Sequence, residues 1–156
     1  MTFWKWWTIN ILVIVGLVVS EYTLEALTMT VKNDTSYLTI VIFIIYWIAA
    51  IQIGVKSYKL QFKDEGYTDD DINMQWYLSD LVMSIGMVGT LVGFIMVLGS
   101  AFAEVDPSDT EAMKGVIASV ATGMGVAILT TLVGLIASIF LKFELVILER
   151  DNAKTL

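Results

Sequence analysis

Two long apolar segments constrain the fold of this chain more than any other feature: residues 81–103 and 116–143. The short acidic stretch 104–114 joins them. A helix rises about 1.5 Å per residue, so each segment is long enough to cross a hydrocarbon core roughly 30 Å thick. Neither segment carries an acidic or basic side chain in its middle, and both are rich in Gly, Ala, Ser and Thr. The pattern predicts a membrane-spanning helical hairpin.

Composition excludes an ordinary soluble domain. Hydrophobic residues make up 57% of the 156 positions, charged residues make up 16%, and the mean hydropathy is +0.77. Soluble domains have an apolar share of about half and a charged share of about a quarter. A single Pro and apolar runs of helical length favour helices over an outer-membrane barrel. We therefore expect an all-α, polytopic membrane protein.

The chain lacks the residues that most enzymes and metal sites use. It has no Cys and no His, which removes thiolate chemistry, the commonest metal ligand and the commonest general base. The acidic run 69–71 lacks the alternating ligands of an EF-hand loop and suits the start of a helix, where the dipole favours negative charge. We expect no catalytic residues, no metal site and no cofactor.

Four membrane-spanning helices are predicted. Aromatic residues and Lys5 precede the apolar run 9–19, as anchors precede a span; a signal peptide begins in a similar way, but no A-x-A-like cleavage site follows. Residues 37–55 give the second span. The third helix is expected from about residue 70 to 102, and the fourth begins near Ser108 in a Ser-x-x-Glu capping box. Helices three and four are therefore long, and we expect them to extend into the cytoplasm.

Charge placement divides and orients the chain. Residues 1–63 hold the first two spans, 64–79 form a short cytoplasmic connector, 80–150 form the hairpin, and 151–156 form a cytoplasmic tail. Seven of the nine Lys and Arg residues fall on one side of a four-span topology. Because cytoplasmic segments carry the excess of these residues, we expect a multi-pass protein with both termini in the cytoplasm.

Small residues form a stripe on each helix of the hairpin. In a bilayer such residues cluster where helices approach closely. We favour close packing inside the subunit or between copies as the role of these small residues. The functional alternative is that they pack against the helix of a partner protein. The positions concerned are Gly86, Gly93, Gly123, Ala127, Gly134 and Ser138.

Thr90, Thr130 and Thr131 are the polar residues near the centre of the hairpin. A membrane Thr often bonds the carbonyl one turn earlier and needs no further role. As donor and acceptor, its hydroxyl can also bind a carboxyl group or hold a water beside one. These three are the candidate pore-lining residues, and the sequence leaves open whether Thr130 or Thr131 faces a pore.

Acidic residues near the hairpin lie at its ends, as Asp80, Glu104 and Glu144 do. Proton relays through membranes use Asp, Glu or His within the span. If this chain conducts protons, a partner must supply the carboxylate.

Two motifs resemble a known family. Residues 88–95, V-G-T-L-V-G-F-I, resemble the L-G-T-V-x-G-I segment of the MotA/TolQ/ExbB proton-channel family. Residues 127–137, A-I-L-T-T-L-V-G-L-I-A, resemble its A-L-x-x-T-x-x-G-L-x-A segment. The resemblance covers residues 80–149, with both motifs in the expected order.

The resemblance implies a ring of five subunits around a pair of single-span partner helices of the MotB/TolR/ExbD type. A partner Asp would take up and release protons opposite Thr90 and Thr131, and the Gly and Ala positions would line the bore. Proton flow would turn the inner pair and do work in the envelope. The segment between spans two and three, about 25 residues, makes a flagellar role doubtful. The process driven and the choice of H⁺ or Na⁺ stay open, and the alternative is a structural or hole-forming tetraspan protein that conducts no protons.

Overall fold

The computed structural model describes residues 2–24, 37–63, 69–102 and 110–153. These residues form four α-helices: α1 (Thr2–Leu24), α3 (Leu38–Phe62), α4 (Asp69–Ala101) and α5 (Thr110–Asn152). All four are long and apolar enough to cross a membrane. The predicted all-α class is confirmed, and the four predicted spans correspond to four helices of sufficient length and hydropathy. The predicted cap at Ser108 lies outside the described residues.

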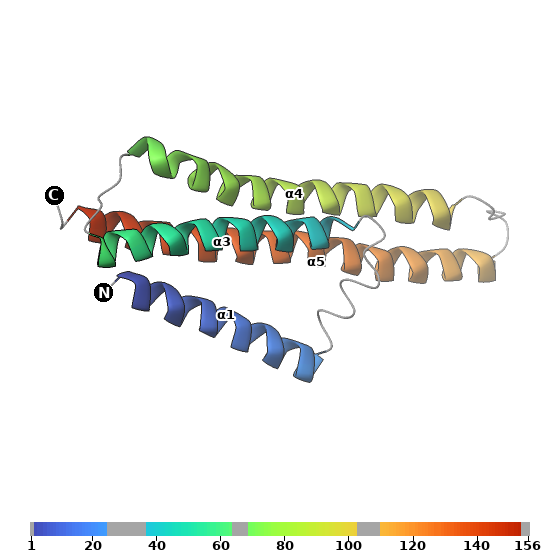
Figure 1. Cartoon of the computed structure of the whole chain (residues 1–156). Helices are drawn as coiled ribbons and strands as arrows, with labels where there is room; N and C mark the ends of the chain where they lie inside the picture. Colours follow the sequence, from blue (N-terminus) through green and yellow to red (C-terminus); the bar gives the residue numbers. More distant parts are fainter. Residues whose placement is uncertain (1, 25–36, 64–68, 103–109, 154–156) are drawn as a thin grey trace.

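The helices form a bundle around the α4–α5 hairpin (Figure 1). α4 and α5 run antiparallel along most of their length, α3 packs against both, and α1 packs against α3 and α5. Both termini lie at the same end of the bundle, as an even number of crossings requires (Figure 1). α1 is closest to the bundle near its first residues and diverges from it toward Leu24.

The hairpin is the longest part of the molecule. α4 has 33 residues and α5 has 43, or about 50 Å and 65 Å of helix at 1.5 Å per residue. At the end away from the termini, both helices extend past α1 and α3 (Figure 1). At the end with the termini, α4 begins well before its apolar segment, as the sequence predicts. The side of the membrane to which each end belongs stays a prediction.

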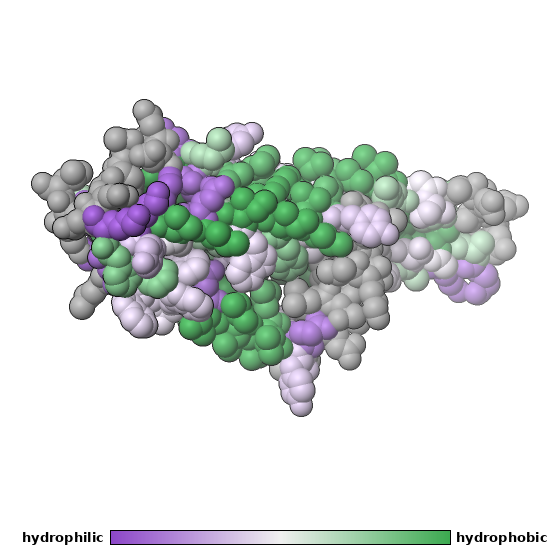
Figure 2. Space-filling model, viewed as in Figure 1, coloured by the Kyte–Doolittle hydropathy of each residue, from purple (hydrophilic) through white to green (hydrophobic). Residues whose placement is uncertain are grey.

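The buried core lies where three or four helices meet. Its largest fully buried apolar side chains include Ile42 and Ile53 of α3, Ile72 of α4, and Leu141 and Leu145 of α5. Large apolar side chains are also exposed on all four helices. Figure 2 shows them across the middle of the visible face, with hydrophilic residues gathered at the end that carries the termini. This distribution is typical of a chain that has lipid as its solvent along its middle.

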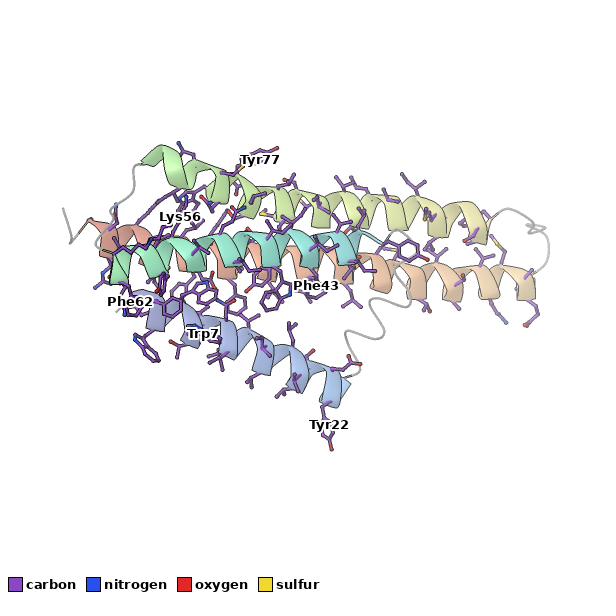
Figure 3. All side chains as sticks on the ribbon, viewed as in Figure 1. Trp7, Tyr22, Phe43, Lys56, Phe62 and Tyr77 are labelled. Carbon is purple, nitrogen blue, oxygen red and sulfur yellow. The ribbon has the colours of Figure 1, made fainter. Side chains whose placement is uncertain are left out.

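Polar contacts tie the helices together at the end with the termini. Lys5 Nζ of α1 lies 2.6 Å from Asp151 Oδ2 of α5. Lys56 of α3 lies toward α4 (Figure 3), where its Nζ donates to Gln75 Oε1 at 3.1 Å. In contrast, Tyr22 near the end of α1 points away from the bundle. α1 is therefore fastened mainly through its first half.

Candidate functional site between α4 and α5

α4 and α5 approach each other closely at Gly86 and Gly134. A Cβ atom on Gly86 would lie 3.2 Å from Gly134 Cα and 3.2 Å from the Thr130 carbonyl oxygen. A Cβ on Gly134 would lie 3.0 Å from Gly86 Cα and 3.0 Å from the Val82 carbonyl oxygen. All of these neighbours are backbone atoms, which cannot rotate away. Only glycine at both positions lets the two helices approach so closely.

The small-residue contact continues along the hairpin toward its tip. A Cβ on Gly93 would lie 3.0 Å from Ala127 Cβ, and one on Gly123 would lie 2.4 Å from a methyl group of Val97. Ser138, nearer the other end of α5, is also buried. The structure thus places the predicted glycines and Ala127 in contact between α4 and α5 of one subunit. Their predicted contact with a partner helix stays a prediction.

Thr90 and Thr131 meet at this seam. Their Oγ1 atoms form a hydrogen bond in which either can be the donor. Thr131 Oγ1 also donates to the Gly86 carbonyl at 2.9 Å, and Thr90 Oγ1 reaches the Ala127 carbonyl at 3.0 Å. Thr90 Oγ1 is also 3.3 Å from the Gly86 carbonyl oxygen, one turn earlier. Each hydroxyl has one proton, so these bonds cannot all form at once. The pair has more acceptors than protons, so the protons can be rearranged without moving heavy atoms.

Thr130 and Thr131 point in different directions. Thr130 is 2% exposed, and its Cγ2 lies 2.6 Å from the position that a Cβ on Gly89 would take. Leu38, the first residue of α3, lies beside the same position at 3.5 Å. Thr130 therefore packs inward against α4 near α3, and Thr131 is the residue that joins Thr90. Whether Thr130 or Thr131 faces a pore stays open, and pore lining by these threonines stays a prediction.

The threonine pair is partly open at the molecular surface and far from charge. Both side chains are half-buried, and their neighbours Leu91 and Leu132 are exposed. Asp80 lies ten residues before Thr90, about 15 Å along α4, and its carboxylate pairs with Lys142 Nζ at 2.8 Å. Within the described residues, no group of His, Cys, Asp or Glu could hold a metal ion. The pair can bind a water or an incoming carboxyl group, but this part of the chain brings no acid to it.

A second polar contact lies away from the hairpin seam, and the sequence analysis missed it. Glu144 of α5 is 2% exposed, and Asn10 of α1 is 4% exposed. Asn10 Nδ2 donates to Glu144 Oε1 at 2.7 Å. The signal that could have revealed the burial is helical spacing, because Glu144 shares a face with Leu141 and Leu148, both fully buried. The pairing with Asn10, 134 positions away, has no local signal.

Comparison with known proteins identifies the family. The model of the MotA/TolQ/ExbB proton channel family matches residues 70–155, which include α4 and α5. Neither the curated proteins nor the solved structures that were searched gave a match.

Proposed function

The chain belongs to the MotA/TolQ/ExbB proton channel family, and from this premise we propose that it is the pore-forming subunit of an ion-driven membrane motor, most simply a proton-driven one. Copies of the chain form a ring around the membrane helices of a partner, and ion flow between ring and partner does mechanical work in the envelope. The chain acts as a channel wall and has no enzymatic role.

The observation that carries this proposal is the Thr90–Thr131 hydroxyl pair. It lies within the apolar length of α4 and α5, and it is held by the Gly86 and Ala127 carbonyls. Close packing at Gly86 and Gly134 fixes the two helices and therefore the position of the hydroxyls. A fixed pair of hydroxyls can donate a hydrogen bond to a mobile carboxyl group. The hydroxyls themselves do not take up or release a proton at neutral pH.

The missing carboxyl group defines the partner. The described parts of α4 and α5 carry their acids toward the helix ends, so the proposal needs a single-span protein of the MotB/TolR/ExbD type with an Asp near the start of its helix. Five copies around two such helices is the proposed assembly. Both termini lie in the cytoplasm, and the membrane is the bacterial inner membrane.

Proton flux in proteoliposomes that hold the chain and its co-expressed partner tests the proposal. Thr90→Val and Thr131→Val keep the shape of the side chain and remove the hydroxyl, so both should lower flux while the complex still assembles. Thr122→Val is the matched control, because Thr122 lies on α5, is exposed and bonds the Ala118 carbonyl one turn away at 3.0 Å. Unchanged flux in both test variants would contradict the role of the pair.

A structural tetraspan protein is the second candidate, and one observation favours it. The hydroxyls of Thr90 and Thr131 are satisfied inside the subunit, and the small residues are used in contacts within the subunit. Such a protein would assemble normally and show no proton flux in any of these variants, including the unmodified chain.

A further inference from the structure

Asn10, Tyr46 and Glu144 form a polar cluster inside the bundle where α1, α3 and α5 meet. Tyr46 is 4% exposed, and it lies in the same buried core as Leu141 and Leu145, the neighbours of Glu144 on α5. Asn10 bonds Glu144 directly. The indole of Trp6 on α1 lies beside the same carboxyl group, and its Nε1 donates to the Ala50 carbonyl at 3.0 Å. The cluster is separate from the threonine pair and has no part in the function proposed above.

The hydrogen bonds of this cluster are incomplete. Glu144 Oε1 accepts from Asn10 Nδ2. Glu144 Oε2, Asn10 Oδ1 and the Tyr46 hydroxyl are buried and have no hydrogen-bond partner among the described residues. If Glu144 is ionised, two buried acceptors, Glu144 Oε2 and Asn10 Oδ1, lack a donor, and the Tyr46 hydroxyl bonds neither of them. A buried polar atom without a hydrogen-bond partner is costly, and more so when it is charged.

The nearby cations are occupied elsewhere. Lys5, on the same helix as Asn10, pairs with Asp151 at 2.6 Å. Lys142, two residues before Glu144, pairs with Asp80 of α4. No Lys or Arg within the described ranges forms an ion pair with Glu144. A buried carboxylate without a cation is one of the costliest arrangements in a protein interior.

We infer that Asn10, Tyr46 and Glu144 form a proton-binding site of this chain, in which Glu144 is a neutral carboxylic acid with its proton on Oε2. The proton converts Oε2 from an unpaired acceptor into a donor. Asn10 Oδ1, on the same amide that donates to Oε1 through Nδ2, is then the acceptor for this proton. No buried charge then remains in the cluster, and among the described residues the Tyr46 hydroxyl still has no hydrogen-bond partner.

The site also connects protonation to the attachment of α1. Asn10 bonds α1 to α5 inside the bundle, and the C-terminal end of α1 diverges from the bundle (Figure 1). Release of the proton leaves a buried carboxylate with no cation beside it, which is a costly arrangement. The Asn10 Nδ2 bond to Oε1 offsets part of this cost, because a hydrogen bond to a carboxylate is stronger than one to a neutral acid.

Infrared spectroscopy of the full chain in lipid nanodiscs at neutral pH tests this inference without a partner and without proton flow. The protein should show a carboxylic-acid C=O band that shifts with ¹³C-labelled Glu and is lost in Glu144→Gln. Glu149→Gln is the matched control, because Glu149 is exposed and accepts a hydrogen bond from Trp76 Nε1 at 2.6 Å; this variant should keep the band.

A second variant, Asn10→Ala, keeps the inference testable if Glu144→Gln does not fold. Asn10→Ala removes the donor to Oε1, the carbonyl oxygen of the acid, so the same band should persist and move to higher frequency. Absence of a Glu-derived acid band from the unmodified protein overturns the inference, as does a band that neither Glu144→Gln nor Asn10→Ala alters. Loss of proton flux in the threonine variants would leave this result unaffected.

Discussion

Thr131 Oγ1 donates a hydrogen bond of 2.9 Å to the carbonyl oxygen of Gly86. Gly86 is also the residue at which α4 comes closest to Gly134 of α5. One position therefore sets both the separation of the two helices and the place of a hydroxyl. Packing of the two helices and hydrogen bonding of the threonine pair both depend on Gly86. A substitution there disturbs both, so separate tests need substitutions that change only one.

Gly86→Ala should destabilise the hairpin. The added methyl would lie 3.2 Å from Gly134 Cα and from the Thr130 carbonyl, and overpacking of this kind costs about 1–3 kcal/mol. Thermal unfolding of the purified chain in detergent measures the change. Gly99→Ala, on the same helix and with nothing within 4 Å, should be neutral or slightly stabilising because alanine favours a helix by about 1 kcal/mol over glycine. Equal effects of the two substitutions would refute the close approach at Gly86.

Gly54→Leu should detach the first half of α1. A Cβ on Gly54 of α3 would lie 2.6 Å from Cζ2 of Trp6, so a larger side chain cannot be accommodated while Trp6 stays in place. Limited proteolysis of α1 in detergent should become faster. Gly16→Leu is the control, since nothing lies within 4 Å of that position. An unchanged cleavage rate in Gly54→Leu would mean that α1 does not pack against α3 as described.

Thr90→Ser and Thr131→Ser should retain proton flux that the valine variants lose. Serine keeps the hydroxyl that bonds the Ala127 or Gly86 carbonyl. If the hydroxyl contributes one hydrogen bond of about 1.4 kcal/mol to the rate-limiting step, valine should slow flux about tenfold. Flux is measured with a pH-sensitive dye inside proteoliposomes. Serine variants as slow as the valine variants would assign the effect to packing of the methyl group.

Asp80→Asn and Lys142→Gln should have small effects on stability. The pair is 2.8 Å apart, and the side chains are 65% and 38% exposed. Exposed ion pairs contribute at most about 1 kcal/mol and are screened by salt. A double-mutant cycle on the unfolding temperature, repeated at high salt, measures the coupling. Strong coupling that survives salt would show that the pair is shielded from water in the assembled protein.

The sequence predicted the features that repeat along a helix. Apolar length predicted four spans, and the spacing of small residues predicted the faces that include Gly86 and Gly134, because these properties depend on one helix at a time. It did not decide between Thr130 and Thr131, since adjacent residues differ by only about 100° around a helix and the packing of Leu38 and Gly89 selects the direction.

The Asn10–Glu144 contact is the clearest case that the sequence analysis missed. Its two residues come from the first and last helices, and their contact depends on how closely α1 packs against α5. The aromatic residues near the start of α1 predicted an anchor at the membrane interface. They did not predict that Trp6 would pack on Gly54 and that Asn10 would therefore lie inside the bundle.

The mass of the purified complex in detergent, with and without a co-expressed single-span partner of the MotB/TolR/ExbD type, tests the central claim most directly. The proposed function predicts a ring of five copies that gains two partner chains. A monomer, or a ring that recruits no partner, would contradict it.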